Sequence, residues 1–268
     1  MIIWLASYPK SGNTWVRIFL KEYYKLIDKD FKDDKFPKIE DLLKLNINYL
    51  NFLEIARNWK TVQNKINLDK RIKFIKTHNA LCTINGHKFT DYDNSLGVIY
   101  IVRDPRDIII SYAHHLGQNH TDVIKGMLDQ QNGELDDYMG KEWKKTIMGR
   151  WSDHYNSWKI FKKENFLLVR YEDLIKNSEK EFIKIINFLK NLINLKYDQK
   201  HISHAIENTT FEKLKKKEEI YGFKEATKHG KFFRKGVSGE WKENLDKEIC
   251  LKIEKSFERE MKELGYLD

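Results

Sequence analysis

Cysteine and proline are both scarce in this chain of 268 residues. The two cysteines, Cys82 and Cys250, are far apart and form no CxxC pair. They indicate neither a disulfide framework nor a thiolate metal site, so we expect two buried or idle thiols. Three prolines leave little room for a proline-rich linker, and no internal repeat recurs at a fixed period. We therefore expect a single domain over residues 1–268.

Long apolar runs are missing as well. No stretch approaches the roughly 20 apolar residues that a membrane span needs. The opening run, residues 2–6, lacks a basic leader and is too short for the apolar part of a signal peptide. We therefore predict a cytoplasmic protein without a membrane span. With 41% apolar and 13% aromatic residues, the chain can still bury a core of its own.

The charge balance favours an anionic ligand. The formal net charge is +9 and the pI is about 9.2. Lysine runs such as residues 215–217, however, are typical of a solvated helix face. Charge alone also does not distinguish a nucleotide ligand from a nucleic acid. A nucleic-acid-binding module is one alternative. We expect no nucleic-acid partner, because the basic residues are spread along the chain and no recognised nucleic-acid motif is present.

Short apolar runs alternate with stretches of helical periodicity. The predicted strands are residues 2–7, 73–76, 98–102 and 166–169. Helical spacing follows the first and third strands and returns over residues 179–190. This alternation predicts an α/β fold with a central parallel sheet flanked by helices on both faces. Polar motifs follow the strands, where such sheets bind ligands.

The first polar motif, YPKSGNTW, spans residues 8–15. It combines backbone N–H groups at a predicted helix N-terminus with one ammonium and two hydroxyls, which suits a phosphate. The ATP-binding pattern GxxxxGK[ST] is absent, because the lysine precedes the glycine. A nucleotide-dependent kinase therefore stays an alternative that this motif disfavours.

The same motif resembles the 5'-phosphosulfate loop, YPKSGTTW, of the cytosolic-type sulfotransferases that use 3'-phosphoadenosine 5'-phosphosulfate (PAPS). Asn13 is the one departure. RDPRDIIISY at 103–112 resembles the family segment that binds the 3'-phosphate of the donor. FRKGVSGEWK at 233–242 resembles RKGxxGDWK, with Glu240 in place of aspartate. The resemblance covers most of the chain and implies a P-loop-like α/β fold.

By this resemblance, sixteen residues bind PAPS or its product, adenosine 3',5'-bisphosphate (PAP). They are Lys10, Ser11, Gly12, Asn13, Thr14, Trp15, Arg103, Ser111, Tyr171, Thr209, Thr210, Phe211, Phe233, Arg234, Lys235 and Gly236. The first five match the phosphosulfate loop, whereas Trp15 and residues 209–211 match the adenine pocket. Arg103, Ser111 and residues 234–236 match the 3'-phosphate site. Taken singly, each aromatic residue is equally compatible with core packing, and Arg103 with an ion pair to a nearby aspartate.

Catalysis is expected at Lys76-Thr77-His78, which resembles the Lys-Thr-His at the end of a family strand. An acceptor hydroxyl becomes a good nucleophile as its proton leaves, and an imidazole suits that task, so His78 is the expected general base. Lys10 and Lys76 are expected to stabilise the negative charge that builds up in in-line transfer. The resemblance further implies that Ser111 holds Lys10 away from the donor until the acceptor binds, which limits wasteful hydrolysis of the donor.

The sequence contains no HExxH motif, EF-hand or Cys/His cluster, and we expect no metal. The expected partner is a small-molecule or carbohydrate acceptor with a hydroxyl or amine. The polar, irregular segment 116–149 is a candidate lid or acceptor-binding insertion, with an ordinary mobile loop as the alternative. We expect a monomer or weak homodimer, because the dimer motif of animal relatives is not evident after Trp241.

Overall fold

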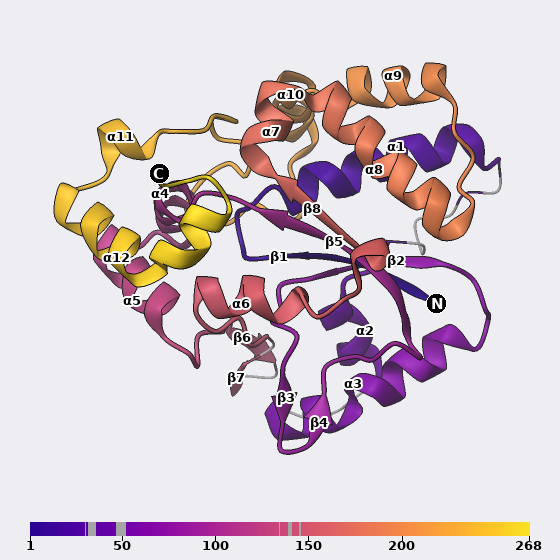
Figure 1. The fold of residues 1–268 in the computed structure, drawn as a ribbon, viewed down its shortest axis with the longest axis horizontal. Helices are drawn as coiled ribbons and strands as arrows, with labels where there is room; N and C mark the ends of the chain where they lie inside the picture. Colours follow the sequence, from indigo (N-terminus) through magenta and orange to yellow (C-terminus); the bar gives the residue numbers. More distant parts are fainter. Residues whose placement is uncertain (30, 32–35, 47–51, 134, 139–140, 145) are drawn as a thin grey trace.

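The structure, a computed structural model, describes residues 1–29, 31, 36–46, 52–133, 135–138, 141–144 and 146–268 (Figure 1). Four parallel strands form the central sheet in the order β2-β1-β5-β8. They are β1 (Ile2–Ser7), β2 (Lys73–Thr77), β5 (Ser95–Val102) and β8 (Phe166–Arg170). Two small antiparallel pairs join β3 (Thr83–Ile84) to β4 (His87–Lys88) and β6 (Leu135–Tyr138) to β7 (Lys141–Lys144). The predicted α/β class is confirmed.

Helices cover both faces of this sheet, as predicted. One face packs against α1 (Asn13–Ile27), α8 (Ser178–Ile193) and α9 (Gln199–Asn208), which lie together in Figure 1. The opposite face packs against α2 (Ile39–Asn46), α3 (Phe52–Asn67), α4 (Pro105–Leu116), α5 (His120–Leu128), α6 (Trp151–Trp158) and α12 (Lys247–Glu263). Short helices complete the chain: a 3-10 turn (Lys163–Asn165), α7 (Tyr171–Lys176), α10 (Phe211–Tyr221) and α11 (Trp241–Asn244).

The period-2 alternation of a strand divides the core in two. In β1, Ile3 and Leu5 join the core with α1 and α8, whereas Trp4 and Ala6 join the core on the opposite face. All four side chains are fully buried. A run that is apolar on both faces is typical of a central parallel strand, which explains why this segment lacks the polar–apolar alternation of a half-exposed strand.

The segment 116–149 differs from its predicted irregular course. Residues 120–128 form α5, whose Val123, Ile124 and Met127 are buried in the core shared with α4 and α12. The signal in the sequence is the apolar spacing of these three residues, which is that of a short amphipathic helix. Part of the segment, residues 134, 139, 140 and 145, lies outside the described residues. The lid hypothesis stays a prediction.

The four sheet strands end at the same edge. Parallel pairing aligns Ala6 with Thr77 and Ser7 with Ile101, so the residues after each strand emerge side by side. Strand β1 lies between β2 and β5. After β1, the chain forms β2 on one side of it and later β5 on the other side. A ligand crevice forms at such a switch point, beyond the carboxyl ends of the strands.

Candidate functional site

A cavity of about 310 Å³ lies at this edge of the sheet. Residues from all four strand ends line it, together with the segment that follows α10. The lining includes Lys10, Gly12, Asn13, Thr14, Trp15, Lys38, Lys76, His78, Arg103, Ser111, Tyr171, Phe211, Glu225, Phe232, Phe233, Arg234, Lys235 and Gly236. The site therefore combines segments that are more than two hundred residues apart in the sequence.

The loop after β1 is held in a tight left-handed turn. Lys10 has φ 65° and Gly12 has φ 98°, and α1 starts directly after the glycine. A Cβ at Gly12 would lie 2.7 Å from the ring of Tyr171, so only glycine fits between the loop and α7. The side-chain amide of Asn13 donates to the backbone carbonyl of Leu5 at 2.8 Å and so holds the loop against β1.

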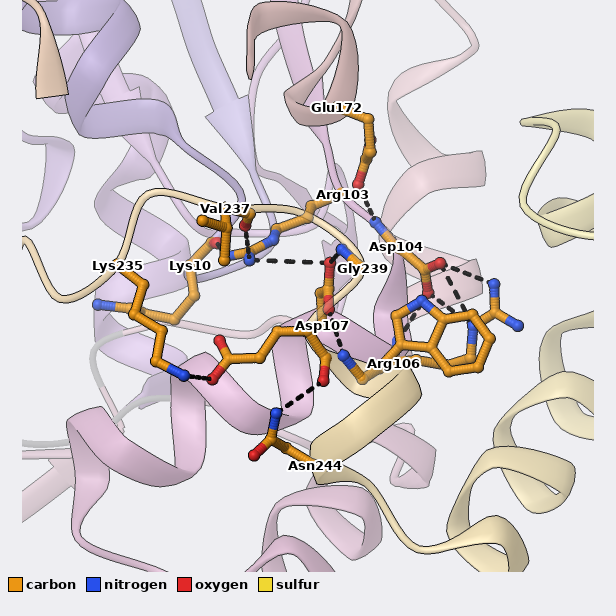
Figure 2. A network of polar contacts seen from close by, with 12 residues as sticks. Lys10, Arg103, Asp104, Arg106, Asp107, Glu172, Lys235, Val237, Gly239 and Asn244 are labelled. Carbon is orange, nitrogen blue, oxygen red and sulfur yellow. Dashed lines mark hydrogen bonds and ion pairs between the residues drawn. The ribbon is translucent and has the colours of Figure 1, made fainter. Parts of the chain in front are cut away.

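Arg103 joins three segments at the centre of the site. Its guanidinium donates to the carbonyl oxygens of Lys10 at 3.2 Å and Val237 at 3.0 Å (Figure 2). It also lies over the ring of Tyr171, 4.3 Å from the centroid. Asp107 is 3.9 Å away, a loose ion pair. Among the described residues the buried Nε of Arg103 has no hydrogen-bond partner, so this arginine keeps donor capacity for a ligand.

Asp107 fixes the C-terminal loop to α4. Its buried carboxylate accepts from the backbone N–H groups of Gly239 at 2.6 Å and Trp241 at 2.9 Å (Figure 2). Between these two residues, Glu240 accepts from Arg234 and Lys235, with the Lys235 bond at 2.7 Å. These cations hold the pKa of Glu240 down at about 2. The glutamate that replaces the family's aspartate thus orients two of the predicted 3'-phosphate ligands.

Cations crowd the cavity. Burial, together with the nearby charges of Arg103, Lys76 and Arg234, lowers the pKa of Lys10 to about 8, whereas Glu225 opposes the shift. The Lys10 ammonium lies over the ring of Phe232, 4.1 Å from its centroid. Such a cluster of like charges is most stable when a multiply charged anion enters it.

His78 lies at the end of β2 with its ring in a defined tautomer. Its Nδ1 is 2.8 Å from the carbonyl oxygen of Ser7, and because a carbonyl only accepts, Nδ1 carries the proton. The lone pair is then on Nε2, the atom that a general base uses. Burial, followed by the charge of Lys76, lowers the pKa of His78 well below its ordinary value of 6.5. The imidazole is therefore neutral at neutral pH.

Most of the predicted site residues meet around this one cavity. Ser11, Thr209 and Thr210 are the exceptions among the described residues, because they do not line it. Thr209 donates its hydroxyl to the carbonyl of Ala205 at 2.7 Å, and its own carbonyl accepts from the Trp15 indole at 2.8 Å. Thr210 caps α10. Contacts between the donor and these three residues stay predictions, as does the expected link between Ser111 and Lys10.

Several residues of the site were not predicted from the sequence. Lys38 contributes one more cation to the lining and Glu225 contributes a carboxylate, whereas Arg17 is outside the lining and pairs with Glu225. Arg17 stands one helical turn after Thr14, a spacing that indicates a common helix face. For Glu225, a single acidic residue in a lysine-rich stretch, no sequence signal points into the cavity.

The parallel sheet, the glycine turn at the β1–α1 junction and the cation-lined cavity together define an α/β protein with an anion-binding edge. Comparison with protein families makes this specific: the model described as Sulfotransferase domain matches residues 2–265. The chain belongs to this sulfotransferase family. The predicted enzyme class, a sulfotransferase, is confirmed.

Curated relatives and solved structures agree with this family. The chain is 28% identical over 278 residues to luciferin sulfotransferase of Photinus pyralis, covering 93% of this chain and 69% of that protein. It is 26% identical to sulfotransferase 1E1 of Homo sapiens, covering 97% and 83%. The fold is similar to those of mouse sulfotransferase SULT7A1 complexed with PAP (TM-score 0.61, 19% identity, 97% and 84% covered) and retinol dehydratase with retinol and PAP (0.64, 19%, 97% and 81%).

Two kinds of feature are absent from the described residues. No helix among them is both long and apolar enough to cross a bilayer. The described part of the chain also brings no three His, Cys, Asp or Glu side chains together as a metal site requires.

Proposed function

We propose that the cavity binds PAPS and that its sulfuryl group is transferred in line to a hydroxyl or amine of a small-molecule or carbohydrate acceptor. The observation that carries this proposal is the convergence of Lys10, Lys76, Arg103 and Arg234 on one cavity beside His78. Mouse SULT7A1 and retinol dehydratase, which have a similar fold, were solved as complexes with PAP, and this supports an adenosine bisphosphate as ligand.

The residues present fit such a nucleotide. The buried Nε of Arg103 and the buried hydroxyl of Ser11 have no partner within the described part of the chain, and both are able to donate to phosphate oxygens. At Gly236 a Cβ would lie 2.4 Å from the ring of Phe211, so the loop backbone approaches this aromatic residue as closely as glycine allows. Trp15 and Phe211 also line the cavity and are the proposed adenine contacts.

His78 is the proposed general base. Its Nδ1–H is held by the Ser7 carbonyl, so Nε2 is available to take the acceptor proton as the new S–O bond forms. The lowered pKa keeps the ring neutral, which is the form that accepts a proton. Positive charge on Lys10 and Lys76 offsets the negative charge that grows on the departing phosphate and on the sulfuryl oxygens.

The decisive experiment compares ligands and then removes the base. PAP at a hundred times its Kd should stabilise the protein by about 2.7 kcal/mol, which corresponds to a Tm rise of roughly 5–10 °C. ATP and an oligonucleotide at the same concentration should give much smaller shifts. With labelled PAPS and a panel of acceptors, His78→Ala should lower turnover by roughly 10²–10⁴-fold while PAP affinity stays within about twofold.

Two results would contradict this function. A larger Tm shift with ATP than with PAP would favour the kinase alternative, and a larger shift with the oligonucleotide would favour a nucleic-acid-binding module. Unchanged turnover in His78→Ala would remove this histidine from the chemistry without affecting the donor assignment. The cytoplasmic location, the single domain over residues 1–268, the absence of a metal and the monomer or weak homodimer stay predictions.

A further inference from the structure

Glu225 places a carboxylate inside the cavity, on the segment 222–240 that follows α10. Its Oε2 accepts from the hydroxyl of Thr14 at 3.0 Å and from the ammonium of Lys76 at 3.2 Å. Its Oε1 contacts Arg17 and lies 3.3 Å from the ammonium of Lys38. The side chain is 11% exposed. One internal carboxylate therefore has three cations and a hydroxyl as partners.

Two of these partners belong to the proposed donor site. Thr14 lies in the phosphosulfate loop and Lys76 precedes the proposed base by two residues. The other two partners have no role in the proposed function: Lys38, beside the start of α2, lines the cavity, and Arg17 on α1 is outside the lining and contacts Glu225. Lys38 is held next to Lys76 by a bridge between the two backbones. All four donors converge on the same two carboxylate oxygens.

The carboxylate and a donor oxygen compete for the same hydrogen. A threonine hydroxyl has one hydrogen, and Thr14 donates it to Glu225. Thr14 is able to bind a phosphate or sulfuryl oxygen as a donor only when Glu225 releases it. A second anion beside an ionised Glu225 would also meet like-charge repulsion. Burial would raise the pKa of the Glu225 carboxyl, but Lys76, Arg17 and Lys38 hold it well below the ordinary value, so the group is charged.

We propose that Thr14, Arg17, Lys38 and Lys76 form an oxyanion subsite for the 5'-phosphosulfate end of the donor, and that Glu225 occupies this subsite in the free enzyme and leaves it when the donor binds. Arg17 and Lys38 are thereby assigned as donor ligands. Glu225 lowers donor affinity, because every binding event must first break its four contacts. This inference rests on the proposed function, since it presupposes that the nucleotide binds in this cavity.

The test compares two nucleotides that differ at the 5' end. Glu225→Gln keeps the shape of the side chain and removes its charge, so calorimetry should show PAP binding about tenfold tighter. Binding of adenosine 3'-monophosphate, which lacks the 5'-phosphate, should change by less than about twofold, because it does not reach the subsite. Glu219→Gln is the matched control: it removes the same charge from an exposed side chain that pairs with Lys231 of the segment, and should change neither affinity.

Arg17→Gln provides the second variant. In the Glu225→Gln background it should weaken PAP binding by about tenfold, as expected for a lost charge-assisted phosphate contact. In the wild-type background the loss should be smaller, because removing Arg17 also loosens Glu225. If Arg17 served only to anchor the segment through Glu225, the loss would instead be larger in the wild-type background.

Several outcomes would overturn the inference. If Glu225→Gln weakened both nucleotides equally, Glu225 would be a clamp that holds the segment and its Arg234 in place. If PAP affinity stayed constant while the acceptor KM changed, the subsite would belong to the acceptor. A wild-type protein that binds neither nucleotide would instead refute the proposed function itself.

Discussion

Single residues in this site have more than one partner, and their charges depend on each other. Lys10 illustrates the point, because burial and neighbouring cations lower its pKa to about 8. An ordinary lysine keeps its proton far above physiological pH, whereas this one loses it just above neutrality. Anion binding favours the protonated form, so donor affinity becomes sensitive to pH.

We predict that PAP binding weakens as the pH rises through about 8. The phosphates of PAP are fully ionised above a pH of about 7, so in this range the change comes from the protein. Above the Lys10 pKa the Kd should rise by up to about tenfold per pH unit, because each binding event must first return a proton to the amine. Calorimetry between pH 7 and about 9.5 measures this slope.

Lys10→Arg is the control for this prediction. A guanidinium keeps its proton throughout the range, so the step should disappear while PAP still binds. A step of the same size in Lys10→Arg would show that another group titrates.

At the scale of elements, side chains of helix α4 hold a loop near the C-terminus in place. Asp107 in the first turn of α4 accepts from two backbone N–H groups more than 130 residues later in the chain. Arg106 lies 3.6 Å from the ring centroid of Trp241, on the same loop. Helix α4, whose N-cap Asp104 directly follows Arg103, thus fixes the loop that contains Arg234.

Asp107→Ala should destabilise the protein by about 3 kcal/mol, since two backbone N–H groups lose a charged, buried acceptor. Amide hydrogen exchange at Gly239 and Trp241 should accelerate. Asp107→Asn keeps one acceptor oxygen and should cause a smaller loss. Asp122→Ala, an exposed carboxylate in the first turn of α5, should stay within about 1 kcal/mol of wild type. An equally small effect of Asp107→Ala in chemical unfolding would show that the loop is held by other contacts.

At the scale of the whole molecule, the formal charge of +9 favours the approach of an anionic donor. The cations of the cavity add a local field of the same sign. Two carboxylates on the C-terminal half of the chain, Glu225 and Glu240, neutralise part of that field within the site. Long-range attraction and local neutralisation thus act on different steps of binding.

The association rate of PAP should therefore fall several-fold when the salt concentration rises from about 0.05 M to about 0.5 M, because the screening length shortens to a few ångströms. The dissociation rate should change much less, since the contacts in the bound state are short-range. Stopped-flow fluorescence of Trp15 and the other tryptophans provides both rates. An association rate independent of salt would mean that the net charge plays no part in donor capture.

Much of this protein was determined by its sequence alone. The four sheet strands were predictable, because buried parallel strands appear as short apolar runs, and the observed β1 matches the predicted range 2–7. The family, and the convergence of most predicted ligands at one edge, followed from motifs whose spacing places polar residues after strands. Helix α5 was missed, because three apolar residues among polar ones give a weak periodic signal.

Only the tertiary structure decided how the charges are paired. Glu225 is about 150 residues from Lys76 and about 210 from Arg17, and nothing local in the sequence links them. The side-chain amide of Asn13 donates to the carbonyl of Leu5, and the hydroxyl of Thr209 donates to a helix carbonyl. The physical reason is that strand periodicity and turn chemistry act over a few residues, whereas ion pairing depends on which chain segments the fold brings within about 4 Å.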